Sequence, residues 1–169
     1  TAVPGDPITV ESLLNHTSGM PSDGNLSVLV TRLTDIGDAN TPLTSEADFR
    51  RHVEGSADER YTDEEHFFYY NTGFALLGKL VAEMTGVDFE RYVRKHVFRP
   101  LEMERSCFSQ SRFEAAEDRM SAYYEAASED GDEEWREGDL GFAETMFAPG
   151  GLASSVVETA TCVRMLMAG

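Results

Sequence analysis

The strongest constraint on the fold is a stripe of apolar residues at helical spacing between residues 72 and 86. The stripe consists of Phe74, Leu77, Leu80, Val81 and Met84. It ends at Gly86, which can take the left-handed conformation that stops a helix. Asp88 is placed to cap a second helix, which Pro100 ends. The inner side of this second helix is predicted to carry Phe89, Tyr92, Val93, His96 and Val97. The sequence therefore predicts a helical hairpin.

A short helix is predicted near the start of the chain. Thr9 can cap the amides of its first turn, and the helix should end near His16, before a turn at Gly19. Helical spacing returns in residues 26–36.

The middle and later segments carry weaker signals. Phe49 and Val53 suggest a further helical turn or two, whereas the polar, acidic residues 54–66 are expected to form a loop. Residues 104–149 lack a sustained period, so any sheet there should be small. The acidic residues 129–134 are expected to form an exposed turn within it.

A last helix is predicted at the other end of the sequence. Ser155 and Glu158 have the spacing of a capping box. The buried stripe of this helix is predicted to consist of Val156, Ala160, Val163, Leu166 and Met167. Residues 1–169 are thus expected to form one mainly α domain, with at most a small β element between about 104 and 149.

Charge limits the class of partner. The chain has 31 acidic and 14 basic residues, spread along its length, so nucleic acid is not an expected partner. The only lysines are Lys79 and Lys95. Such a composition favours a halophilic source, where salt screens the self-repulsion; an ordinary acidic protein is the alternative. No stretch reaches the ~18 to 20 apolar residues that span a bilayer. We expect a soluble chain, in the cytoplasm or outside the cell.

Metal and disulfide signals are weak. Cys107 and Cys162 can form a disulfide, but two lone cysteines in a domain of this size more often stay reduced. Asp130, Asp132 and Glu134 alternate like calcium ligands yet lack the remaining ligand positions, which favours a solvated acidic loop. No zinc-binding spacing occurs among the histidines and cysteines. We expect no metal and no cofactor.

Three separated segments together resemble one protein family, in the same order. They are Ile-Thr-Val-Glu-Ser-Leu-Leu-Asn-His-Thr-Ser-Gly-Met-Pro at 8–21, Phe-Tyr-Tyr-Asn-Thr-Gly-Phe-Ala-Leu-Leu-Gly at 68–78 with its continuation through 98–103, and Pro-Gly-Gly-Leu-Ala-Ser-Ser at 149–155. They resemble the serine β-lactamase and penicillin-binding protein family, which includes class C β-lactamases, D-alanyl-D-alanine carboxypeptidases and esterases. Only the central helical portion of that family is matched. The resemblance implies a helical subdomain, a fragment of a larger hydrolase with the β-lactamase/transpeptidase-like fold.

The resemblance also implies a chemistry. In the family a serine attacks a β-lactam, D-amino peptide or ester carbonyl, and water then releases the acyl-enzyme. Tyr69 would be the general base or proton shuttle. Asn71 would contact the substrate and the lysine, and Tyr70 would lie between them at the substrate site. The expected ligand of the intact protein is therefore a small-molecule or peptide substrate.

The family's other two motifs are absent from these residues. No serine stands three residues before Lys79 or Lys95, so no Ser-x-x-Lys motif can form, and no third motif follows the Gly-Gly-Leu block. Residues 16–19 imitate the third motif in composition, but we interpret them as a turn. A phenol acts as a base at neutral pH only beside stabilising cations, so Tyr69 should be a poor base here.

We therefore expect the chain alone to be inactive without the N- and C-terminal parts of the same protein. The alternative is a non-catalytic binding module, or a pseudoenzyme, on the same helical scaffold. The oligomeric state is left open.

Overall fold

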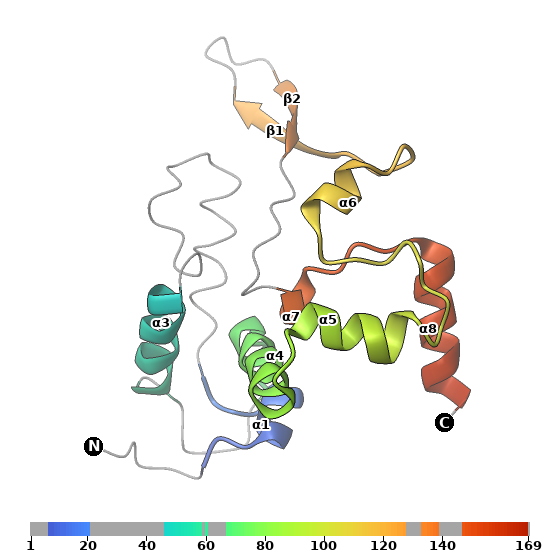
Figure 1. Ribbon diagram of the computed structural model, residues 1–169. Helices are drawn as coiled ribbons and strands as arrows, with labels where there is room; N and C mark the ends of the chain where they lie inside the picture. The colour runs from blue at the N-terminus through green and yellow to red at the C-terminus, as the bar shows by residue number, and fades with distance from the viewer. Residues whose placement is uncertain are drawn as a thin grey trace.

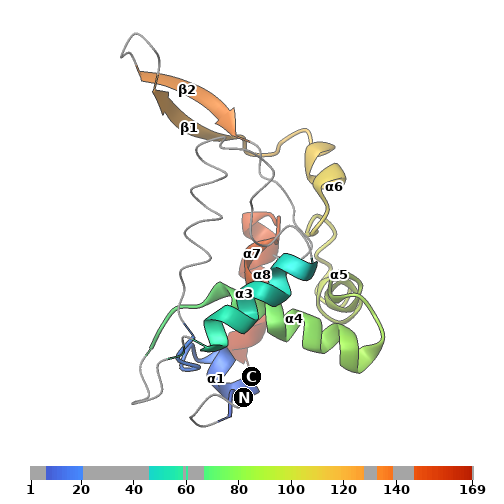
Figure 2. The same ribbon diagram turned by 90° about the vertical axis from the view of Figure 1, so that its left-hand side faces the viewer.

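The computed structural model describes residues 7–20, 46–58, 60, 67–127, 133–138 and 147–168. Its elements are α1 (Val10–Leu14), α3 (Glu46–Asp58), α4 (Asn71–Thr85), α5 (Phe89–Val93), the π-helix η2 (Arg94–Phe98), α6 (Gln110–Glu114), β1 (Ala122–Ala127), β2 (Glu133–Gly138), α7 (Phe147–Gly150) and α8 (Val156–Ala168). Helix α4 contacts α1, α5 and α7, and the β1–β2 hairpin stands apart at one end (Figures 1 and 2). The prediction of a mainly α fold is confirmed.

Helix α1 forms where the sequence predicts it. The Thr9 hydroxyl accepts a hydrogen bond from the Ser12 amide at 3.0 Å, and the Ser12 hydroxyl accepts one from the Thr9 amide at 2.9 Å. These reciprocal bonds satisfy amides that the first turn leaves unpaired. The chain then turns at His16, which has a positive φ of 57°. The helix predicted at 26–36 lies outside the described residues.

The predicted helical hairpin is confirmed, with local differences. Leu80 and Met84 of the predicted stripe are exposed, and the Asp88 side chain makes no capping hydrogen bond. Gly86 ends α4 with φ 65°, and its amide donates to the Ala82 carbonyl at 2.9 Å. The Arg99 amide bonds to the carbonyl of Arg94, five residues back, as a π-helix requires. This wider turn changes the angular spacing of the side chains. His96, predicted on the inner side, is exposed and packs on Tyr92 with ring centroids 4.4 Å apart.

Helix α3 is longer than the sequence suggests. The prediction of a loop from residue 54 is wrong up to Asp58, where the helix ends. Phe49 is 2% exposed and Ser56 is 6% exposed, so this side of the helix is buried along its length. Arg50 and Glu54, which lie in between, are exposed, and solvated charges do not interrupt a helix whose other face is packed.

The buried side of α3 packs on α4. Phe49 and Ala75 form a small apolar cluster, to which Val53 and Leu76 add partly buried side chains. Lys79 lies over the Phe49 ring at 4.7 Å and pairs with the Glu46 carboxylate. Both lysine contacts therefore tie α4 to α3.

A second apolar cluster joins the hairpin to the last third of the chain. Its buried members are Phe98, Met103 and Phe108, packed against Phe89, Val93, Val97, Leu101, Phe147 and Cys162. The Phe108 ring lies 5.8 Å from that of Phe98 and 5.4 Å from that of Phe147. Cys107 and Cys162 are both free thiols.

Helix α7 approaches α4 very closely at Gly78. A Cβ atom at Gly78 would lie 2.7 Å from the Cβ of Ala148, which is too short for two carbon atoms. Neither atom could move without shifting a helix, because both would be attached directly to backbone. The sequence therefore needs glycine where these helices meet.

The segment before α8 is bound to residues 105–107. Backbone amides and carbonyls of Cys107 and Ala153 exchange two hydrogen bonds of 2.9 Å. Ser155 caps α8 as predicted, accepting from the Glu158 amide at 3.3 Å. The Glu158 carboxylate instead accepts from the Arg105 amide at 2.8 Å and from the Ser106 hydroxyl at 2.6 Å. Ser106 is 1% exposed, so this carboxylate satisfies a buried donor.

The buried stripe predicted for α8 is wrong in this structure. No residue of the helix is buried, and the exposed fractions are 86% for Val156, 69% for Leu166 and 82% for Met167. The amphipathic pattern correctly gives a helix, but it does not say which element covers the apolar face. None of the helices in the described ranges is both long and apolar enough to cross a lipid bilayer.

The small β element predicted between 104 and 149 is confirmed. Strands β1 and β2 are antiparallel, and Glu125 is paired with Trp135. The centre of the predicted acidic turn lies outside the described residues, whereas Glu133 and Glu134 belong to β2.

Candidate active site

The segment 68–78, called the motif segment below, contains two adjacent tyrosines that lie in different environments. The Tyr69 side chain is 56% exposed, whereas that of Tyr70 is 1% exposed. Tyr70 has the extended backbone angles φ −138° and ψ 97°, and successive side chains of an extended segment point to opposite sides. Only Tyr69 therefore presents its phenol at the surface, while the Tyr70 side chain lies beneath it.

Asn71 is the first residue of α4 and is half-buried. It lies two residues after Tyr69, at the point where the chain changes from extended to helical. An amide at this place offers both a donor and an acceptor, and the exposed Tyr69 phenol offers a hydroxyl. Together these groups can contact the carbonyl of a ligand and pass a proton.

His16 holds this segment, and the sequence reasoning missed it. The His16 carbonyl accepts a hydrogen bond from the Phe68 amide at 2.8 Å, and its Nδ1 accepts one from the Tyr70 amide at 3.1 Å. Because Nδ1 is an acceptor, the hydrogen bond assigns the neutral tautomer with its proton on Nε2. His16, in the turn that follows α1, thus satisfies two backbone amides of the motif segment.

The imidazole ring of His16 also packs among aromatic side chains. Its centroid lies 4.5 Å from that of Tyr69, 5.1 Å from that of Phe74 and 5.5 Å from that of Phe67. His16 and Tyr70 are 54 positions apart, so no local pattern links them. The available signal was a histidine just before a Gly19 turn, inside a segment already singled out for its family resemblance.

Burial raises the pKa of the Tyr70 hydroxyl above its ordinary value of 10.0. The nearby Ser56 and Thr72 hydroxyls lower the pKa, but by less than burial raises it. Tyr70 is therefore neutral in the folded protein well beyond neutral pH. The burial of its side chain does not favour the substrate contact expected for this residue.

The raised pKa of Tyr70 predicts a loss of stability in alkali. Above about pH 10 the unfolded chain releases this proton first, so that raising the pH favours unfolding by up to about 1.4 kcal/mol per pH unit until the higher folded pKa is reached. Below about pH 10 Tyr70 should add no pH dependence. Urea unfolding from about pH 8 to about pH 11.5 measures the decline. The Tyr70→Phe variant should lack the part of this decline that comes from Tyr70. If the free energy of unfolding fell equally steeply with pH in both proteins, the raised pKa of Tyr70 would be contradicted.

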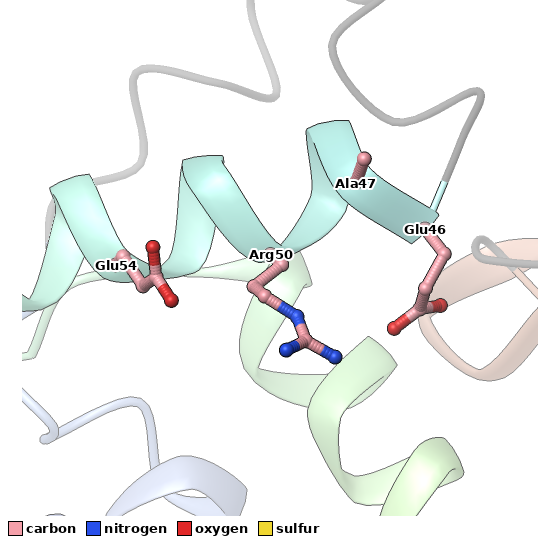
Figure 3. Close-up of a pocket in the computed structure, with 4 residues that line it drawn as sticks. All are labelled: Glu46, Ala47, Arg50 and Glu54. Carbon is pink, nitrogen blue, oxygen red and sulfur yellow. The ribbon is translucent and has the colours of Figure 1, made fainter.

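Charged groups near α3 form a separate feature. A hollow on α3 is lined by Glu46, Ala47, Arg50 and Glu54, whose side chains Figure 3 shows along one side of the helix. It contains neither Tyr69 nor Asn71. In the described part of the chain, no group of three or more histidine, cysteine or acidic residues is arranged to hold a metal ion.

Comparison with known proteins adds a family match. The profile of the family described as Beta-lactamase matches residues 1–168. A curated relative, Protein flp of Staphylococcus aureus strain MW2, is 28% identical over 113 residues, which are 67% of this chain and 21% of that protein. The chain thus spans about a fifth of the curated relatives that it matches.

Solved structures agree with the family match. The octameric penicillin-binding protein homologue from Pyrococcus abyssi has a TM-score of 0.81 and 30% identity, over 98% of this chain and 36% of that one. A D-stereospecific amidohydrolase from Streptomyces sp. has a TM-score of 0.69 and 23% identity, over 98% of this chain and 49% of that one. The second likeness concerns the fold alone.

Proposed function

This chain belongs to the beta-lactamase family, and on that basis we propose that it is part of a serine hydrolase that works through an acyl-enzyme. The observation that carries the proposal is the exposed Tyr69 phenol two residues before Asn71, at the start of α4. The likeness to a penicillin-binding protein homologue supports an amide or lactam carbonyl as the group attacked, with esters as a related class.

The proposed reaction has two steps. A serine oxygen attacks the substrate carbonyl carbon, and its proton passes through the Tyr69 hydroxyl to the leaving amine or alcohol as the C–N or C–O bond breaks. Water then attacks the acyl-enzyme and releases the acid and the free serine. The side-chain amide of Asn71 donates a hydrogen bond to the substrate carbonyl. The attacking serine and its lysine partner lie in parts of the protein outside these 169 residues, because no Ser-x-x-Lys sequence occurs here.

Covalent labelling of the full-length protein tests this proposal. A fluorophosphonate probe should label one serine outside residues 1–169, and a β-lactam or ester in excess should slow the labelling. Heat-denatured protein serves as the control, because an activated serine needs the fold. Peptide mapping by mass spectrometry locates the label. Absence of labelling would remove the enzyme assignment in favour of a binding module or pseudoenzyme, and a label within residues 1–169 would contradict the division of the site.

A further inference from the structure

We infer that His16 is a positioning residue that fixes the direction of the Tyr69 phenol; this rests on the proposed role of Tyr69 as the proton shuttle. The two hydrogen bonds to His16 come from the residues immediately before and after Tyr69. Hydrogen bonds on both sides of a residue fix its backbone, and the backbone sets the direction in which its Cα–Cβ bond points. His16 therefore acts on Tyr69 through the backbone of residues 68–70.

The ring of His16 adds a second constraint. It lies 4.5 Å from the Tyr69 ring, with 37° between the planes. Tyr69 is more than half exposed, so the packing of a protein interior does not hold its side chain. The imidazole is an aromatic neighbour that limits where the Tyr69 ring can lie.

The backbone of His16 is shaped for this task. Its φ of 57° is the left-handed conformation, which is uncommon for residues other than glycine, asparagine, aspartate and histidine. In this conformation the His16 carbonyl accepts a hydrogen bond from the Phe68 amide while its Nδ1 accepts one from the Tyr70 amide. Asparagine tolerates the same backbone and carries an acceptor oxygen near the place of Nδ1, so it can replace the bond without the ring.

Three variants of the full-length protein separate these parts. His16→Asn keeps the acceptor and the left-handed backbone, His16→Phe keeps the ring without the acceptor, and His16→Gly keeps only the backbone freedom. Rates are expressed per active serine, titrated with the fluorophosphonate probe, so that loss of folded protein does not count as loss of rate.

We expect kcat per active serine to fall by about 10- to 100-fold in His16→Gly, with KM changed by less than about threefold, because a small misplacement of a catalytic group is costly. His16→Phe should lose nearly as much, and His16→Asn should recover to within about fivefold of the wild type. If His16→Asn were as slow as His16→Gly, or if the variants lowered only the melting temperature, the inference would be overturned.

A readout that does not depend on activity separates this inference from the proposed function. With 3-fluorotyrosine at position 69, the 19F signal of the full-length protein should move toward that of a solvent-exposed tyrosine in His16→Gly but much less in His16→Asn. This shift in a protein that forms no acyl-enzyme would keep the positioning role and reject the hydrolase. An unchanged signal in all three variants would reject the positioning role, whatever the activity.

Discussion

Replacing Tyr69 by phenylalanine in the full-length protein should lower kcat for nitrocefin or a nitrophenyl ester by about 10²- to 10⁴-fold, the usual contribution of a positioned general base. Tyr69 is 56% exposed, and the variant loses only its hydroxyl group. The free energy of unfolding should therefore change little. Steady-state kinetics and thermal unfolding measure the two effects separately. A large kinetic loss with an unchanged melting temperature is the signature of a proton shuttle.

Tyr123→Phe is a matched control for this experiment. Tyr123 lies on β1 and is 60% exposed, close to the value for Tyr69, but it belongs to a hairpin that stands apart from α4 (Figure 1). Its variant should keep the wild-type rate. A Tyr69→Phe rate within about threefold of the wild type would favour a binding scaffold over an enzyme.

The 169-residue chain on its own should show no turnover of nitrocefin or of nitrophenyl esters, and no serine in it should react with the fluorophosphonate probe. The reason is chemical, because neither lysine of the chain has a serine three residues before it. Lys79 is in addition engaged by Glu46 and Phe49, on the α3 side of α4. The full-length protein under the same conditions is the positive control.

This result is informative only if the isolated chain is folded. Cys107 is 3% exposed and provides the check, since a buried thiol reacts slowly with a thiol reagent until the chain is unfolded. Slow modification of Cys107 together with absent turnover would support the prediction. Turnover by the isolated chain would show that it contains its own nucleophile.

Local patterns were enough to predict the elements around the candidate site. The α4 stripe and Gly86 give a helix and its end, because both depend on residues a few positions apart. The extent of α3 depends on the contact of Phe49 with Ala75, and the exposure of His96 depends on a π-turn. Neither contact nor π-turn leaves a periodic mark in the sequence.

The candidate site was predicted by resemblance and completed by tertiary contacts. The sequence singles out Tyr69, Tyr70 and Asn71, but it does not say which tyrosine faces the solvent. Tyr70 is the buried one, because its side chain lies against α3 and α4, with its hydroxyl near those of Ser56 and Thr72. The role of His16 depends on a bond across 54 positions, which single-sequence reasoning cannot reach.

The missing side chain at Gly78 has a consequence for the spacing of two motif segments. Helix α4 begins with the tyrosine motif, and α7 leads into the Gly-Gly-Leu segment, so the contact of Gly78 with Ala148 connects the two family motifs. A methyl group added there would push the two helices apart, because both carbon atoms would be attached directly to backbone. A single methyl group at position 78 would therefore change the separation of the two motif segments while Tyr69 and Asn71 themselves stayed the same.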